Sequence, residues 1–335
     1  MFVWLLALVV CVPGLAMPQD AHGPTYEVDL SQSITHYVTI EMTVAATGDE
    51  TQLMMATWTP GSYLIREYAR HIDQINATTT GGRKLPLIKT SKNRWTVSNG
   101  EHREFKVRYR LFCKEASVRT NNVDFNHAVL NGAATYLTVP EQLELPHDVH
   151  LKLPEHWSRS ESSMVRGRKD DHHYLANNFD ELVDSPIVAG NVITYPFEVD
   201  GVPHYLVNVN QEGNWNADEA TEALAKVVAE HHKVWGEIPY DRYYFLNVFG
   251  SGGGGLEHNN CCLMMSGSFD VRNDSRFQRW LSLASHEFFH TWNIRRLRPK
   301  SLVKYDYENE VYTPSLWIAE GVTSYYEDLM LVPRA

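Results

Sequence analysis

Two different spacings of apolar residues divide the chain into two parts. From about residue 26 to residue 196, apolar side chains recur at every second position, as in YVTIEMTV (37–44) and FKVRYRLF (105–112). This alternation is typical of strands that bury one face of a sheet. Turn-rich stretches separate these segments, so we predict an N-terminal antiparallel β-sandwich.

After about residue 210 the spacing becomes helical. Residues 217–235 carry apolar side chains on one helix face, YYFLNVF (243–249) is typical of a buried strand, and further helices are predicted from about residue 274 and within residues 313–331. The predicted fold class is therefore α+β. We place the domain boundary near residue 200, which gives a β-sandwich domain at 17–200 and a second domain at 201–335.

The first residues, MFVWLLALVVCVPGLAMPQD, are typical of a signal peptide, with small residues before a cleavage site after Ala16. The segment has no Lys or Arg near its start, so a buried N-terminal strand is the alternative. No later stretch is long and apolar enough to cross a membrane. We expect a secreted or periplasmic protein, with signal peptide 1–16 and no stable membrane anchor.

The charge and the cysteines exclude some functions. The 335 residues carry a formal net charge of −11, and no basic run is present, so nucleic acid is not expected as a partner. Cys113, Cys261 and Cys262 remain after cleavage and are interpreted as packing residues. The last two are adjacent and point to opposite sides of a strand. A disulfide between Cys113 and one of them stays open.

The segment SHEFFHTWNIRRLRP (285–299) contains the strongest chemical signal. His286 and His290 are four residues apart, so on a helix both can bind one zinc ion. Glu287 is displaced around the helix and can reach a zinc-bound water as a general base. The alternative is a buried helix whose two histidines are hydrogen-bonded to the protein.

A catalytic zinc needs a third protein ligand, and Glu320 in LWIAEGVTSYY is the candidate. Its neighbours Leu316, Trp317 and Ile318 are apolar, which predicts a buried helix. A buried glutamate needs a compensating cation. Glu327 lies about two turns later and is the rival ligand. One Zn²⁺ per chain is predicted.

Several segments together resemble one family. HEFFHTWNIRRLRP with LWIAEGVTSYYEDL, TWTPGSYLIREYARHI (57–72), FDELVDSPI (179–187) and GGGGLEH (252–258) resemble segments of the M61 zinc aminopeptidases, the glycyl aminopeptidase family of gluzincins. The resemblance implies a thermolysin-like domain at 201–335, with zinc ligands His286, His290 and Glu320 and with Glu287 as base.

The resemblance also implies a substrate site. Glu257 would hold the free α-amino group of the substrate, and Gly254 and Gly255 would let the substrate backbone approach an edge strand. His258 would orient Glu257 or contact the substrate, or it is a surface histidine. On glycine content alone, the segment is a flexible loop.

The aromatic residues leave two roles open. Tyr325 and Tyr326 are candidate oxyanion donors, although neither shares the helix face of Glu320, and core packing is the alternative. Trp58, Tyr63 and Tyr68 are interpreted as packing between the domains rather than as a substrate wall. The chain ends at LMLVPRA, so it resembles an N-terminal fragment that lacks the C-terminal helical lobe and PDZ domain of the family.

The sequence therefore predicts a secreted zinc aminopeptidase that releases small N-terminal residues, Gly or Ala, from peptides with a free N-terminus. The alternatives are a zinc endopeptidase and, because of the truncation, a catalytically weak, zinc-stabilised binding module. The oligomeric state stays open.

Overall fold

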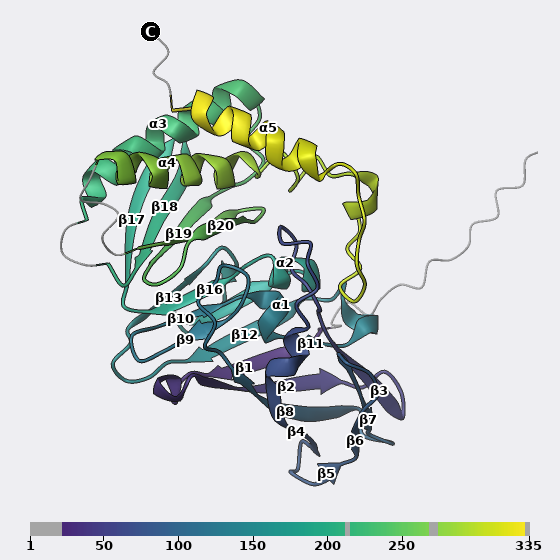
Figure 1. The fold of residues 1–335 in the computed structure, drawn as a ribbon. Helices are drawn as coiled ribbons and strands as arrows, with labels where there is room; N and C mark the ends of the chain where they lie inside the picture. Colours follow the sequence, from purple (N-terminus) through teal and green to yellow (C-terminus); the bar gives the residue numbers. More distant parts are fainter. Residues whose placement is uncertain (1–21, 212–214, 268–273, 332–335) are drawn as a thin grey trace, which may run out of the picture.

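The computed structural model describes residues 22–211, 215–267 and 274–331, which form sheets in the N-terminal part and a sheet with helices in the C-terminal part (Figure 1). The predicted signal peptide 1–16 lies outside the described residues. Among the described helices, none combines the length and apolar character needed to span a membrane.

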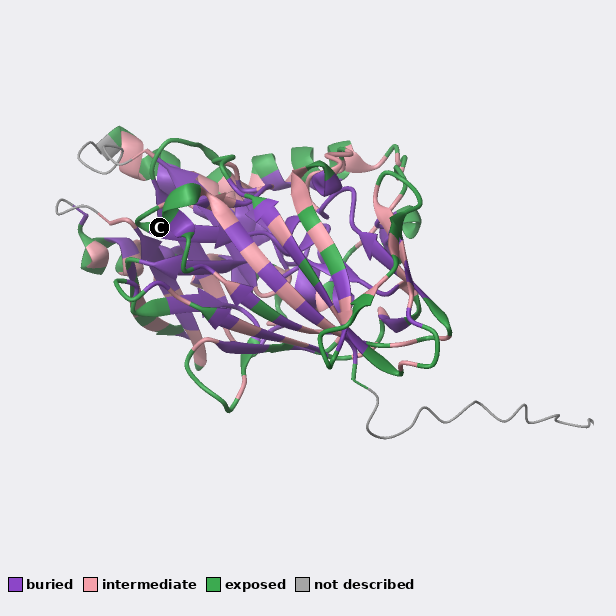
Figure 2. Cartoon of the chain, turned by 90° about the horizontal axis from the view of Figure 1, so that it is seen from below, coloured by how far each residue is buried: buried purple, intermediate pink, exposed green. Residues whose placement is uncertain are grey.

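The largest sheet has eight strands in the order β14-β15-β12-β1-β2-β8-β4-β5. Its strands are β1 (Thr25–Asp29), β2 (Tyr37–Ala45), β4 (Ile72–Thr79), β5 (Lys84–Leu85), β8 (Glu104–Phe112), β12 (His147–Lys152), β14 (Val165–Arg166) and β15 (His173–Ala176). Buried and more exposed residues alternate along β1, β2, β8 and β12, as the sequence pattern predicts (Figure 2). All neighbours are antiparallel except β1 and β12, which run parallel.

Two four-stranded sheets complete the N-terminal part, in the orders β11-β3-β7-β6 and β13-β16-β10-β9. Their strands are β3 (Glu50–Met55), β6 (Leu87–Lys89), β7 (Arg94–Ser98), β9 (Asn122–Val123), β10 (His127–Leu130), β11 (Leu137–Thr138), β13 (Arg159–Ser162) and β16 (Ile187–Gly190). The connections contain α1 (Gly132–Thr135), α2 (Phe179–Val183), η1 (Ser33–Thr35), η2 (Tyr68–His71) and η3 (Pro140–Gln142). Residues from all three sheets share one apolar core, and the α+β class is confirmed.

The C-terminal part contains a five-stranded sheet in the order β17-β18-β19-β21-β20. Its strands are β17 (Val192–Val199), β18 (Val202–Val209), β19 (Tyr243–Phe249), β20 (Gly254–Glu257) and β21 (Cys261–Ser266). The middle three strands are parallel, and the edge strands β17 and β20 are antiparallel to their neighbours.

The predicted domain boundary at residue 200 needs correction. It falls at the turn of the β17–β18 hairpin, and β17 belongs to the five-stranded sheet. The second part therefore begins near Val192. The alternation of β17 resembles that of the preceding strands, and such a pattern does not reveal which sheet a strand joins.

Both faces of the five-stranded sheet are covered. The helices α3 (Ala217–Trp235), α4 (Asp274–Phe289) and α5 (Leu316–Leu329) lie on one side of the sheet, and the N-terminal sheets lie on the other (Figure 1). Phe245 and Cys262 of the sheet pack with α3 and α4. On the other face, Cys261 packs in a core that includes Val129 and Val188.

The cysteine interpretation is confirmed in this arrangement. Cys113, Cys261 and Cys262 are free and buried, so the disulfide left open by the sequence is not formed. The two adjacent cysteines enter different cores on opposite faces of β21. Burial raises the pKa of the Cys113 thiol to about 12, which keeps it protonated at neutral pH.

The buried side chain of His147 makes the stability of the fold depend on pH. Its ring is fully buried in the N-terminal core and lies 6.0 Å from the Tyr26 ring and 5.8 Å from the Phe179 ring, measured between centroids. Burial lowers the pKa of His147 to about 4. An unfolded histidine has a pKa of about 6.5, so the unfolded chain binds more protons between these two values.

We predict that the free energy of unfolding falls as the pH drops from about 6.5 towards the folded-state pKa, because protonation then favours the unfolded chain. The His147 contribution between pH 7 and pH 5 is about 2 kcal/mol. His147→Phe should reduce this pH dependence by that amount in urea unfolding followed by tryptophan fluorescence. An unchanged difference between the two pH values would contradict the assignment.

Candidate active site

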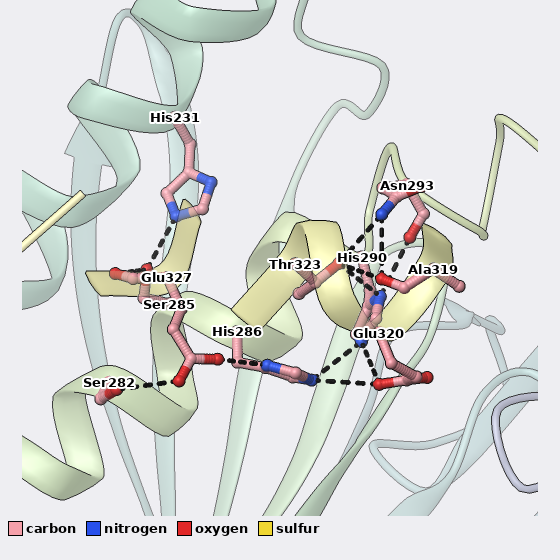
Figure 3. Close-up of polar contacts among 10 residues, drawn as sticks. All are labelled: His231, Ser282, Ser285, His286, His290, Asn293, Ala319, Glu320, Thr323 and Glu327. Carbon is pink, nitrogen blue, oxygen red and sulfur yellow. Dashed lines mark hydrogen bonds and ion pairs between the residues drawn. The ribbon is translucent and has the colours of Figure 1, made fainter. Parts of the chain in front are cut away.

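Helix α4, the turn directly after it and helix α5 bring His286, His290 and Glu320 together (Figure 3). The two Nε2 atoms are 3.0 Å apart, and the Glu320 Oε2 atom lies 3.5 Å from the Nε2 of His286 and 3.6 Å from that of His290. Ligands bound tetrahedrally to zinc at 2.0–2.1 Å are separated by about 3.3 Å. The three atoms therefore fit a single zinc ion.

The outer nitrogens of both rings are engaged elsewhere. The Nδ1 of His286 donates to the Glu327 carboxylate, and the Nδ1 of His290 donates to the Asn293 carbonyl at 3.0 Å (Figure 3). With the protons on Nδ1, both Nε2 lone pairs are free for a metal. Glu327, the rival ligand, thus contacts the side of His286 that faces away from Glu320.

Glu327 is itself held by serines of α4. Ser282 donates to its carboxylate at 3.4 Å, and Ser285 donates to its backbone carbonyl at 3.0 Å. The Nε2 of His231 in α3 lies 3.1 Å from the Ser285 hydroxyl. These contacts connect all three helices on the side of His286 that faces away from Glu320 (Figure 3).

The expectation that apolar neighbours bury Glu320 is wrong. Trp317 is 71% exposed and Ile318 is 42% exposed, whereas the buried residues of α5 are Ala319 and Thr323. The latter two are four residues apart and share one helix face. A short continuous apolar run does not reveal which face of a helix is buried, and the Glu320 side chain is 49% exposed.

The histidine pair lies in a strongly negative environment. Burial lowers the pKa of His286, but hydrogen bonds to Glu320 and Glu327 outweigh this effect and raise the pKa to about 10, so a metal that binds Nε2 must displace a proton from it. Burial raises the pKa of Glu320, but hydrogen bonds to both histidines outweigh this effect and lower the pKa to about 2. The arrangement stabilises positive charge between these side chains, as a cation site requires.

Glu287 projects from α4 towards strand β20. It is 4% exposed, and a Cβ atom on Gly255 would lie only 2.1 Å from its Oε1 atom. Glu257, also 4% exposed, is close enough that it, Glu287 and His290 offer ligand atoms within 4.8 Å of one another. Burial and then the Glu257 carboxylate raise the pKa of Glu287 well above its usual range.

The glycine-rich segment divides into a loop and a strand. Gly254 and Gly255 belong to β20, where Gly254 has a φ of 97° and open space around it. Among the described strands, β20 pairs only with β21, so its other edge is free. The flexible-loop alternative therefore does not describe these two glycines.

Glu257 and His258 are both buried, and their partners differ. The Oε1 atom of Glu257 has no hydrogen-bond partner among the described residues. The Nδ1 of His258 donates to Asp184 at 3.1 Å, and Asp184 also accepts from the Asn259 backbone at 2.8 Å and from the buried Arg295 guanidinium. The surface-histidine alternative for His258 is wrong, because this cluster excludes water from it.

A turn at residues 59–63 also contributes to the site, which the sequence pattern does not reveal. Trp58 packs between the domains as interpreted, with its ring near those of Tyr305 and Tyr307. Tyr68 is buried within the N-terminal part, where its hydroxyl donates to the Arg119 carbonyl at 2.7 Å. Gly61, however, lies directly against Glu257, and burial followed by the Glu257 carboxylate raises the pKa of Tyr63. The TPGSY sequence signals a turn, but it does not signal what the turn contacts.

Tyr325 and Tyr326 have different surroundings. The Tyr326 ring stacks on Phe289 with centroids 5.2 Å apart, which agrees with the packing alternative. Tyr325 is 65% exposed. Their role as oxyanion donors stays a prediction.

A mixed sheet covered by helices, with an HExxH helix facing a glutamate on a second helix, defines a zinc-metallopeptidase-like site. Two models of one family match the chain: the Peptidase M61 N-terminal domain at residues 25–191 and M61 glycyl aminopeptidase at residues 279–334. Together they match more than half of the sequence. The chain belongs to the M61 family.

Solved structures agree with this assignment. An aminopeptidase N family protein from Idiomarina loihiensis is 32% identical with a TM-score of 0.86, and the match covers 92% of this chain and 54% of that one. This chain thus spans about half of that protein. No match was found among the curated proteins.

Two more distant structures share the fold. Aminopeptidase A from Legionella pneumophila is 14% identical with a TM-score of 0.56, and the match covers 92% of this chain and 37% of that one. An M1 zinc metallopeptidase from Deinococcus radiodurans is 11% identical with a TM-score of 0.53, and the match covers 92% and 69%.

Glu327→Gln should lower zinc affinity by about 10–100-fold, because the amide orients the His286 ring less strongly than the carboxylate does. Zinc Kd measured by competition with a chelator tests this. Asp328→Asn, an equal loss of charge at an exposed neighbouring position, serves as the control. Equal zinc affinity in the two variants would show that Glu327 does not support the site.

Proposed function

We propose that the chain forms the zinc-binding and substrate-binding part of a secreted aminopeptidase that removes small N-terminal residues. The observation that carries the proposal is the trio of His286, His290 and Glu320, whose ligand atoms are 3.0, 3.5 and 3.6 Å apart. Membership of the M61 family and the aminopeptidase-like fold support it. The preference for Gly is supported by the family description, Ala is added as the next smallest residue, and secretion follows the N-terminal sequence.

The trio would hold a zinc ion that polarises the scissile carbonyl and acidifies a water molecule. The Glu287 carboxylate lies close to His290 and next to Gly255, so it can accept the proton of the attacking water. Its raised pKa suits a group that then returns the proton to the leaving amine. Burial also keeps competing bulk water away from the carboxylate.

The free edge of β20 suits an extended peptide. A substrate backbone can add to this edge as a further strand, and Gly254 and Gly255 present no side chains that would block it. At the end of the strand, the Glu257 carboxylate, whose Oε1 atom has no hydrogen-bond partner in the described part of the chain, can pair with the substrate's ammonium group. This pairing places the first peptide bond at the metal.

Glu257 favours an aminopeptidase over the endopeptidase alternative. A buried carboxylate with an oxygen that lacks a partner is costly unless a cation joins it. An N-terminal ammonium supplies that cation, whereas an internal peptide segment does not. For a zinc-stabilised binding module, neither Glu257 nor Glu287 would need to be ionisable.

Glu287→Gln should reduce kcat for glycyl and alanyl p-nitroanilides by about 10²–10⁴-fold, because the amide cannot accept a proton. Zinc content, measured by elemental analysis, should stay at one ion per chain. Asp328→Asn is the control and should retain activity. A Glu287→Gln protein with full activity would exclude this mechanism, and a wild-type protein without hydrolysis would favour the binding module.

Glu257→Gln should raise KM for free-amine substrates by about 10–100-fold, since a charge-assisted hydrogen bond is lost. The wild-type protein should leave N-acetylated peptides intact. Steady-state kinetics on matched free and acetylated peptides give both results. Efficient cleavage of acetylated peptides, unaffected by Glu257→Gln, would identify an endopeptidase instead.

A further inference from the structure

The turn at residues 59–63 reaches from the N-terminal part into the site. A Cβ atom on Gly61 would lie 2.7 and 2.8 Å from the two carboxylate oxygens of Glu257 and 2.7 Å from the Leu256 Cδ1 atom. These distances are shorter than any ordinary contact with carbon. The backbone at Gly61 therefore packs directly on the Glu257 side chain.

The two residues that lead into the turn, Thr57 and Trp58, are bonded to the segment between α4 and α5. The Thr57 backbone donates to the Tyr307 carbonyl at 2.8 Å, and the Trp58 indole donates to the Asp306 carbonyl at 2.7 Å. The Trp58 ring also contacts the rings of Tyr305 and Tyr307, at 5.8 and 6.3 Å between centroids. The turn is therefore held by contacts with Glu257 and by the bonds of Thr57 and Trp58 to this segment.

The backbone around the turn is strained, which indicates that its shape is enforced. Gly61 has a φ of 89°, Tyr63 of 54° and Glu67 of 50°. Residues other than glycine rarely adopt a positive φ, and the surrounding structure must hold them there. Two factors exclude a side chain at Gly61. The positive φ would strain any other residue, and a Cβ atom would collide with the Glu257 carboxylate.

We propose that Gly61 is a positioning residue: the turn at 59–63 holds the Glu257 carboxylate at the depth where it meets the ammonium group of the substrate. The N-terminal domain thereby sets the affinity of the site for a free amino terminus. This inference rests on the proposed function, since it assumes that Glu257 binds the substrate's amine.

Gly61→Ala tests the proposal against Gly82→Ala. Gly82 has nearly the same φ, 86°, but no atom within 4 Å of an added Cβ, so it reproduces the backbone strain without the contact. Gly61→Ala should raise KM for glycyl p-nitroanilide by about tenfold or more, with kcat changed less. Gly82→Ala should stay within about twofold. Equal KM values for the two variants would overturn the proposal.

A shorter carboxylate provides a second test. In a Glu257→Asp background the carboxylate retracts from the added methyl, so Gly61→Ala should change KM further by less than about twofold. A KM increase as large as that in the Glu257 background would show that the methyl acts elsewhere. The melting temperature and zinc content of each protein show whether it is folded and loaded.

Trp58→Phe weakens the attachment of the same turn without altering Gly61. It keeps an aromatic ring but removes the hydrogen bond to the Asp306 carbonyl, so KM should rise in the same direction, by about threefold. This variant replaces Gly61→Ala if that protein does not fold. An unchanged KM would count against a turn that is held by this bond.

Binding without turnover separates this proposal from the proposed function. In the zinc-loaded Glu287→Gln protein, calorimetry should show glycinamide binding that Gly61→Ala weakens by about tenfold and Gly82→Ala does not, and N-acetylglycinamide should not bind. If glycinamide binds and the wild-type protein hydrolyses nothing, the proposed function fails alone. If Gly61→Ala binds glycinamide as the unmodified background does, the positioning role fails alone.

Discussion

The hydrogen bonds on the outer nitrogens of His286 and His290 determine what the site can do. A histidine presents a lone pair to a metal only from the nitrogen that carries no proton. The Glu327 carboxylate and the Asn293 carbonyl keep the protons on Nδ1. The Asn293 amide also donates to the Ala319 carbonyl at 3.0 Å, so α5 is anchored to the end of the histidine helix. Asn293 therefore helps to fix both the orientation of the His290 ring and the position of α5, the helix that carries Glu320.

The acidic side chains of the site differ in how far they are buried. Glu320 is half exposed and adjoins the histidines, whereas Glu257 and Glu287 are buried and close to each other. Burial, followed by the nearby Glu257 carboxylate, raises the pKa of Glu287, which a nearby positive charge would offset. The nearby Asp184 is neutralised separately by Arg295. The unbalanced charge is thus concentrated where a metal ion and a substrate ammonium group are proposed to bind.

The sequence was sufficient for the local features and insufficient for the distant ones. The spacing of His286 and His290 on a helix, the strand alternation and the chemical need for a carboxylate such as Glu320 all follow from nearby residues. The burial of Glu320 and the boundary at residue 200 were wrong, because periodicity shows that a face is covered but not what covers it. The contact of Gly61 with Glu257 joins segments far apart in the chain, and no local pattern predicts it.

The five-stranded sheet contributes residues to two apolar cores, one on each of its faces. Cys262 faces the helices and Cys261 faces the N-terminal sheets, so the same strand is packed from both sides. Loss of packing on either face removes support from the other, because both cores use residues of the same strands. The M61 N-terminal domain is therefore a structural foundation of the metal-site half, and the two parts should melt in a single cooperative transition.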